Sequence, residues 1–294
     1  MNFLNKTKNK DQAKIHSRFS GLSQTRSYDA KTALSLAIAC DLAYEKRDKE
    51  IKRTVESWGF KLEGVAHVAK KPDIDTQCYV MSDDISVVVV FRGSDSLKDW
   101  LANFQSVYDP GPLDNTRVHE GFQDALFPAA VPITKLLNQA LTTGDKKIWI
   151  TGHSLGGALC SLYAGMLTEN AREVYGVYTF GSPRPGNGAF EEQLNDKLKE
   201  GPHFRVINSG DVVPHVPPEP FYSHPGERVI LKETSITHSS DSWFNQRVEA
   251  LKVFIKNTSN LLEIGDNHKI SGDSESYISR LIKDVERSEN HDQH

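Results

Sequence analysis

The sequence has few of the features that mark specialised classes of protein. Three cysteines among 294 residues cannot form a closed disulfide framework, so at least one thiol stays unpaired. Their positions, Cys40, Cys78 and Cys160, match no zinc-binding spacing, and we expect neither a metal ion nor a cofactor. No apolar run approaches the roughly 18 residues of a membrane-spanning helix, so we expect no transmembrane segment.

A strong excess of one charge is also missing. The formal net charge is −4, which argues against a dedicated nucleic-acid binder, since such proteins are usually basic. The chain is 38% hydrophobic and 25% charged, values that exclude a collagen-like, coiled-coil or wholly disordered protein. The composition therefore predicts a globular protein without a nucleic-acid partner.

The first 27 residues contain six Lys or Arg residues against one Asp and have few apolar side chains. This composition predicts a polar, basic and poorly ordered arm over residues 1–27. No apolar h-region of a Sec signal peptide follows it. We therefore expect a cytoplasmic protein, or one exported by a non-Sec route. One domain is expected over residues 28–288, followed by a polar tail over 289–294.

Strand patterns alternate with helical patterns along the chain, which is typical of an α/β fold with a mainly parallel central sheet. The apolar periodicity predicts strands at 85–91, 147–151, 174–180, 204–208 and 228–231. It predicts helices at 29–44, 119–141, 154–170, 188–199, 241–256 and 274–287. Pro128 and Pro132 are expected to kink or break the second of these helices.

A serine stands where the sequence passes from a strand to a helix. Residues 152–156 read GHSLG, follow the strand segment KIWIT, and open a glycine-rich helix. In this setting the G-x-S-x-G pattern places a serine on a sharp turn above the sheet. A serine hydroxyl needs a base oriented by a carboxylate. Asp211, in the loop after strand 204–208, is the best candidate acid.

Several further sequence blocks match the pattern of a known protein family. They are VVVVFRGSDSLKDW (87–100), VHEGF (118–122), TGHSLGGAL (151–159), TFGSPRPGN (179–187), RVINSGDVVPHVPP (205–218) and YSHPGERV (222–229). In order and spacing the chain resembles the class 3 (fungal-type) lipase family over residues 28–285. The resemblance implies a single-domain, three-layer α/β-hydrolase fold.

The resemblance also implies roles for particular residues. Ser154 would be the nucleophile and Asp211 the triad acid, and Ser94 and the backbone N–H of Leu155 would form the oxyanion hole. His119, His153, His215 and His224 lie inside family blocks, where the resemblance makes them framework residues. His291 and His294 belong to the tail.

Two histidines compete for the role of the base. His268 leads into a terminal helix that contains Tyr277, which fits the family's ending, although Asn267 stands where an acidic residue often precedes the base. His238 is only 14 residues past His224, closer than the family's usual connection. We favour His268 and keep His238 as the alternative.

An apolar stripe follows the oxyanion block. Leu97, Trp100, Leu101 and Phe104 have the spacing of one helical face. The common explanation of such a stripe is a helix packed on the core, but the resemblance implies a lid over the active site at this position.

Together these features predict a serine hydrolase that cleaves carboxylic esters of lipids, in the manner of a triacylglycerol lipase or esterase. Its partners would be a lipid or ester substrate and, transiently, a lipid–water interface. A phospholipase or galactolipase acting on membrane lipids is the alternative within enzymes. A catalytically silent lipase-like binding module is the alternative outside them. The oligomeric state is left open.

Overall fold

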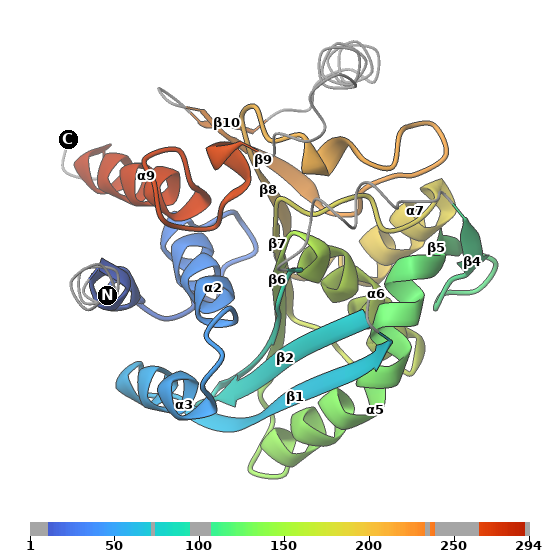
Figure 1. Ribbon diagram of the computed structural model, residues 1–294, viewed down its shortest axis with the longest axis horizontal. Helices are drawn as coiled ribbons and strands as arrows, with labels where there is room; N and C mark the ends of the chain where they lie inside the picture. Colours follow the sequence, from blue (N-terminus) through green and yellow to red (C-terminus); the bar gives the residue numbers. More distant parts are fainter. Residues whose placement is uncertain (1–10, 72–73, 95–106, 233–235, 239–264, 292–294) are drawn as a thin grey trace.

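A central sheet organises the part of the chain that the structure, a computed structural model, describes: residues 11–71, 74–94, 107–232, 236–238 and 265–291. Its strands are β1 (Lys61–Lys71), β2 (Ile74–Ser82), β3 (Ser86–Phe91), β6 (Lys147–His153), β7 (Gly176–Phe180), β8 (His203–Asn208), β9 (Glu227–Leu231) and β10 (Ile236–His238). These eight strands lie in the order β1-β2-β3-β6-β7-β8-β9-β10 (Figure 1).

Helices flank this sheet on both sides. They are α2 (Ala30–Leu42), α3 (Asp48–Ser57), α5 (Glu120–Leu141), α6 (Leu155–Glu169), α7 (Gly188–Lys197) and α9 (Tyr277–His291). Strands β4 (Tyr108–Pro110) and β5 (Arg117–His119) form a separate two-stranded sheet, and short 3₁₀ turns cover Val213–His215 and Asp266–His268. The predicted α/β architecture is therefore confirmed. The predicted helix 241–256 lies outside the described residues.

The middle of the sheet is parallel and its edges are antiparallel. The pairs from β3 through β6, β7 and β8 to β9 run parallel, whereas β1 with β2, β2 with β3, and β9 with β10 run antiparallel. The sequence analysis did not predict β1 and β2, because charged residues and Gly64 interrupt their apolar alternation. Their long hairpin extends the sheet beyond the parallel core.

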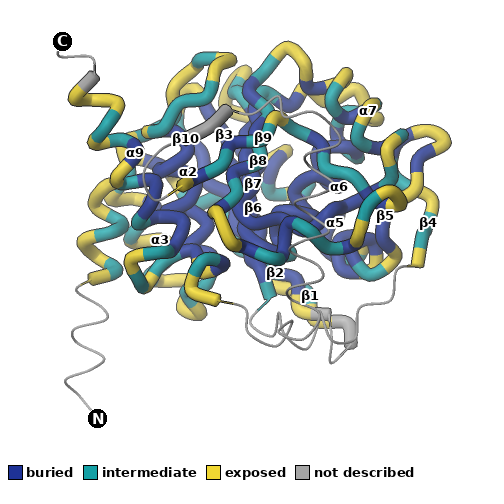
Figure 2. The backbone as a smooth tube through the Cα atoms, turned by 90° about the horizontal axis from the view of Figure 1, so that it is seen from above, coloured by how far each residue is buried: buried dark blue, intermediate teal, exposed yellow. Residues whose placement is uncertain are grey.

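Alternating side chains of the sheet build two hydrophobic clusters, one on each face. In β3, Val87, Val89 and Phe91 belong to the cluster under α5, α6 and α7, while Val88 and Val90 belong to the cluster under α2, α3 and α9. Figure 1 shows these two groups of helices on opposite sides of the sheet, and Figure 2 shows the buried strands between them. Because helices cover both faces, the central strands read as continuous apolar runs.

Helix α5 runs unbroken through both of its prolines. Pro128 and Pro132 were expected to kink or break this segment; they do not break it, since Glu120–Leu141 is one helix of 22 residues. Each proline lacks the N–H that would bond the carbonyl four residues earlier. The carbonyls concerned belong to Asp124, which is exposed, and Pro128, which is half-buried, so they lie on the outer side of the helix, where water can bond them.

The N-terminal segment packs on the domain from residue 11 onward. The predicted disorder of the arm is wrong for residues 11–27, because Ile15, Phe19 and Leu22 pack against the cluster under α2, α3 and α9. The Phe19 ring stacks on Trp58 with centroids 4.3 Å apart, and Trp58 Nε1–H donates to the His16 carbonyl at 2.9 Å. Widely spaced apolar residues in a basic segment give no periodic signal, so composition alone missed this contact.

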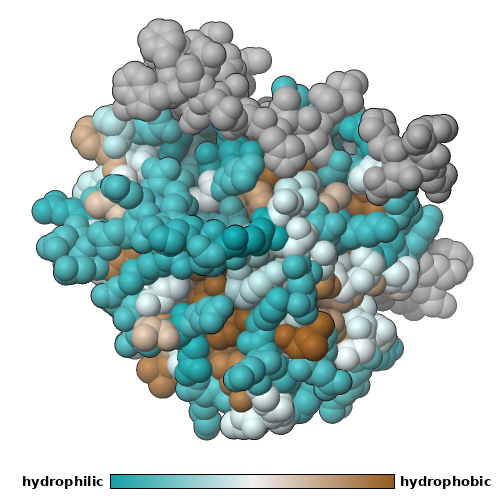
Figure 3. Space-filling view, turned by 180° about the vertical axis from the view of Figure 1, so that it is seen from behind, coloured by the Kyte–Doolittle hydropathy of each residue, from teal (hydrophilic) through white to brown (hydrophobic). Residues whose placement is uncertain are grey.

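The molecular surface carries a mixture of polar and apolar groups. Seen from behind, it is mainly hydrophilic with apolar areas between the polar side chains (Figure 3). Within the described ranges, no helix combines the length and apolar character needed to cross a bilayer.

We predict that Phe19→Ala lowers the free energy of unfolding by roughly 2 kcal/mol, because it removes a partly buried aromatic side chain from the Trp58 contact. Urea denaturation followed by circular dichroism measures this loss. Lys14→Ala is the matched control, since Lys14 is exposed in the same segment. Equal stabilities of the two variants would contradict the packing of this segment.

Candidate active site

Ser154 stands on a strained turn between β6 and α6. Its backbone has φ 59° and ψ −132°, a conformation that residues with a side chain rarely adopt. Two glycines permit this turn: a Cβ on Gly152 would lie 2.2 Å from the Gly156 carbonyl oxygen, and a Cβ on Gly156 would lie 2.5 Å from the Phe91 carbonyl oxygen. Glycine is therefore required at both positions because a side chain would clash with the neighbouring backbone. Backbone strain such as that of Ser154 is common at functional sites.

Asp211 and His268 form a buried pair beside this turn. His268 Nδ1 lies 2.9 Å from Asp211 Oδ2 and 3.0 Å from Oδ1. Since a carboxylate only accepts, Nδ1 carries the proton and donates it to Asp211. The two side chains come from the loop after β8 and from the 3₁₀ turn before α9, and both are almost wholly buried. The structure therefore brings together the acid and the favoured histidine.

Two further donors hold the Asp211 carboxylate. Tyr277 Oη–H donates to Oδ2 at 2.6 Å, and the Val213 N–H donates to Oδ1 at 3.0 Å. Burial, with the neighbouring Asp211 charge, raises the pKa of Tyr277 well above its usual value, so the phenol stays protonated. Its oxygen in turn accepts from the Asn208 N–H at 3.1 Å. Three donors thus satisfy a buried charge that would otherwise be costly.

His153, next to the serine, connects His268 to the turn. Its Nε2–H donates to the His268 carbonyl at 2.7 Å, and its Nδ1 accepts from the Tyr44 hydroxyl at 2.9 Å. Burial, together with the adjacent His268, lowers the pKa of His153 well below its ordinary value. A neutral His153 with its proton on Nε2 fits both contacts, so this residue fixes the backbone of His268 and takes no proton.

Two polar side-chain atoms near this turn are buried and make no hydrogen bond among the described residues. Ser154 Oγ and His268 Nε2 are both shielded from solvent, and neither has a hydrogen-bond partner within the described part of the chain. Both residues border the end of β7: the Ser154 N–H donates to the Phe180 carbonyl at 2.9 Å, and a Cβ on Gly181 would lie 3.1 Å from His268 Cε1. Such an arrangement leaves a donor and an acceptor available for a reaction.

Ser94 and Leu155 lie next to the same turn. Leu155 is the first residue of α6, so its N–H belongs to the positive end of that helix. Gly93, directly before Ser94, approaches so closely that a Cβ there would lie 3.1 Å from Ser154 Cβ. Ser94 itself is half-buried. The chain just before Ser94 thus passes close to Ser154.

Other predicted site residues are less fully described. The stripe of Leu97, Trp100, Leu101 and Phe104 lies outside the described residues. The backbone of His238 pairs with Val229 at the end of the sheet, while the His238 side chain lies outside the described part.

Besides His153, two of the predicted framework histidines make side-chain hydrogen bonds. His119 Nδ1 accepts from the Gly121 N–H and caps α5. His224 Nε2–H donates to the Pro214 carbonyl at 2.7 Å, and burial lowers the pKa of His224 well below normal. Burial also lowers the pKa of His215, to about 4. Across the described ranges, no group of three or more His, Cys, Asp or Glu side chains could hold a metal ion.

The sequence analysis missed two hydroxyl groups at the site. Tyr277 was noted only as part of the terminal helix, and its position nine residues after His268 could not show that it reaches Asp211. Tyr44 gave no signal, because its contact with His153 joins segments 109 residues apart in the chain.

Comparison with known proteins agrees with this geometry. The family model for Lipase (class 3) matches residues 88–221, the stretch that contains Ser94, Ser154 and Asp211. Over this stretch the chain is similar to the class 3 lipases. A lipase from Rhizomucor miehei is 35% identical over 172 residues, which cover 55% of this chain and 46% of that protein. Secreted mono- and diacylglycerol lipase 1 from Fusarium solani is 34% identical over 151 residues, which cover 50% of this chain and 44% of that protein.

The solved structure of the Rhizomucor miehei triacylglyceride lipase matches with a TM-score of 0.63 at 23% identity, over 79% of this chain and 96% of that chain. This likeness confirms the α/β-hydrolase fold of the class 3 lipases. In sequence, the chain spans less than half the length of the two relatives above.

The predicted location is wrong. The sequence analysis expected a cytoplasmic protein or export by a non-Sec route, whereas the Fusarium solani relative carries the name of a secreted enzyme. Relatives from Malassezia globosa are also named as secreted lipases. The expectation rested on the composition of one short segment, which reports a single kind of export signal.

We predict that Tyr277→Phe lowers the free energy of unfolding by about 1.5–3 kcal/mol, because a buried carboxylate loses a hydrogen bond. Thermal and urea denaturation measure the loss. Tyr175→Phe is the matched control: its hydroxyl makes no hydrogen bond among the described residues, although its ring contacts Lys147. A Tyr277→Phe variant as stable as the Tyr175→Phe variant would contradict a stabilising hydrogen bond from Tyr277 to Asp211.

Proposed function

We propose that this protein hydrolyses carboxylic esters of lipids through an acyl-enzyme on Ser154. The observation that carries the proposal is the buried Asp211–His268 pair beside a strained serine whose Oγ has no other bond in the described part of the chain. The match to the class 3 lipase model and the names of the relatives, which include lipases and mono- and diacylglycerol lipases, support a lipid ester as substrate.

In the first half of the reaction, Ser154 Oγ attacks the ester carbonyl carbon and its proton passes to His268 Nε2. Asp211 accepts from Nδ1 and stabilises the imidazolium that forms. The Leu155 N–H and Ser94 donate to the oxyanion, and one such donor is typically worth about 10²–10³ in rate. The tetrahedral intermediate then collapses: the bond to the alcohol oxygen breaks, and Nε2–H protonates the leaving alcohol.

In the second half, water attacks the acyl carbon while His268 Nε2 takes one of its protons. The second tetrahedral intermediate releases the fatty acid and returns the proton from Nε2 to Ser154 Oγ. The net reaction consumes one ester and one water and yields one acid and one alcohol. Each proton transfer uses Ser154 Oγ or His268 Nε2.

As part of this proposal, residues 28–288 form the hydrolase domain and 289–294 a polar tail. The substrate is a triacylglycerol or a smaller lipid ester presented at a lipid–water interface. Secretion, the property named for several relatives, would bring the enzyme to such lipids outside the cell.

We predict that Ser154→Ala abolishes both hydrolysis of p-nitrophenyl esters and labelling by a fluorophosphonate probe, because both require Oγ as nucleophile. The variant serves as the blank for a panel of p-nitrophenyl esters, triacylglycerols and phospholipids. Circular dichroism checks that it folds. Turnover that survives the substitution would rule out the nucleophile, and a wild-type chain that never reacts with the probe would indicate a silent module.

We also predict that His268→Ala lowers kcat by about four orders of magnitude or more, as loss of a triad member does elsewhere. His238→Ala is the control and should leave kcat within about twofold, since His268 already pairs with Asp211. Steady-state kinetics with a soluble ester measure both. The reverse pattern, in which only His238→Ala is inactive, would transfer the role of base to His238.

A further inference from the structure

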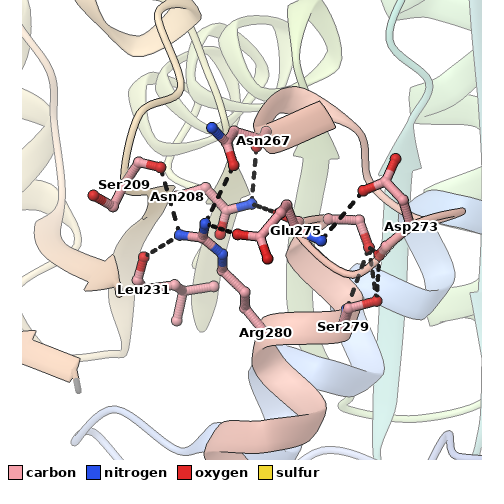
Figure 4. Close-up of polar contacts among 9 residues, drawn as sticks. Asn208, Ser209, Leu231, Asn267, Asp273, Glu275, Ser279 and Arg280 are labelled. Atoms are coloured by element: carbon pink, nitrogen blue, oxygen red, sulfur yellow. Dashed lines mark hydrogen bonds and ion pairs between the residues drawn. The ribbon is translucent and has the colours of Figure 1, made fainter. Parts of the chain in front are cut away.

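Arg280 is a buried arginine of α9 that takes no part in the reaction described above. Its side chain is 5% exposed, and it contacts the loops that carry Asp211 and His268. Figure 4 shows its guanidinium group at the centre of a set of polar contacts that come from different segments of the chain. Burial of a guanidinium is costly unless its donors are used, so these contacts indicate its task.

The guanidinium bonds to both catalytic loops at once. Nη2–H donates to Asn267 Oδ1 at 3.2 Å, and Asn267 immediately precedes His268. Nη1–H donates to the Leu231 carbonyl at 2.9 Å and, at 3.5 Å, to the carbonyl of Ser209, two residues before Asp211. The charge is balanced by the Glu275 carboxylate, which contacts Nη2.

The side-chain amide of Asn208 also links the end of β8 to the segment that carries His268. Asn208, the last residue of β8, donates from Nδ2 to the Asn267 carbonyl at 2.8 Å and to the Glu275 carbonyl at 3.0 Å. The two loops also touch directly, since a Cβ on Gly210 would lie 2.8 Å from Asn267 Nδ2. Asn267, the residue at which this chain departs from the family's pattern, thus joins the base to both Arg280 and Asn208.

We propose that Arg280 is a positioning residue that holds the Asp211 loop and the His268 turn at the separation their hydrogen bond requires. This inference rests on the proposed function. The two terminal nitrogens of a planar guanidinium suit four acceptors in three segments, whereas the ammonium group of a lysine is a compact charge that cannot span them. Within the described part of the chain, Arg280 bonds to none of the side chains of Ser154, Asp211 and His268, so it acts through the loops.

The test compares Arg280→Met and Arg280→Lys with Lys283→Met, which removes an exposed cation from the same helix. For a soluble ester, kcat per active site titrated with a fluorophosphonate should fall about 10- to 100-fold in Arg280→Met, because small displacements of catalytic groups have effects of this size. KM should stay within about twofold, and Arg280→Lys should recover only part of kcat. Lys283→Met should match the wild type.

A spectroscopic readout separates positioning from stability and from the proposed function. The downfield proton resonance of His268 Nδ1–H, assigned by its loss in His268→Asn, should be present in the wild type and in Lys283→Met. It should weaken or move upfield in Arg280→Met. If that variant does not fold, Arg280→Lys decides by the same resonance.

An unchanged resonance in a folded Arg280 variant would overturn the proposal, as would an unchanged kcat per titrated site in an active enzyme. A lower melting temperature with both readouts unchanged would show a structural role only and overturn it too. If the wild type cleaves no ester but the resonance responds as described, the positioning role stands and the proposed function fails.

Discussion

The hydrogen bond from His268 Nδ1 to Asp211 is the interaction on which the rest of the site depends. The Asp211 carboxylate is buried and accepts hydrogen bonds from an imidazole, a phenol and a backbone amide. Removal of one partner of a buried charged pair typically costs about 3–5 kcal/mol, so the surrounding structure must keep every donor in place. The loops after β8 and before α9, with the start of α9, hold these donors.

The partners are far apart in sequence, and only the sheet brings them together. Ser154 follows β6, Asp211 follows β8, and His268 lies 57 residues after Asp211. Parallel strands end at one edge, so the first two arrive there by topology alone. His268 comes from the segment after the sheet and needs separate fastening.

Four contacts hold the segment that carries His268. The His268 carbonyl accepts from His153, which is next to Ser154, and Asn267 contacts Asn208 and Arg280. At the far end of the loop, Ser271 Oγ–H donates to Asp41, which also contacts His16 from the N-terminal segment. Contacts through α2 and the loop before α9 therefore connect residues 11–27 to the segment that carries His268.

The sequence predicted the parts of the site that local chemistry determines. The serine turn, Asp211 and the α/β alternation follow from motif, strand position and periodicity, and His268 followed from resemblance and now pairs with Asp211. Tyr44 and Arg280 were beyond sequence reasoning, because their contacts depend on tertiary packing. The β1–β2 hairpin was missed because charged residues and Gly64 interrupt its apolar alternation, while the helix at 119–141 was predicted and only its continuity through Pro128 and Pro132 was left open.

Mapping of the acyl group most directly tests the central claim that the Asp211–His268 pair activates Ser154. The enzyme is mixed with excess p-nitrophenyl ester, quenched in acid within the first turnovers, digested and analysed by mass spectrometry. The account predicts one acyl group on the peptide that contains Ser154, and none when the same experiment uses Asp211→Ala. An acyl group on another residue, or equally rapid acylation of Ser154 in Asp211→Ala, would contradict it.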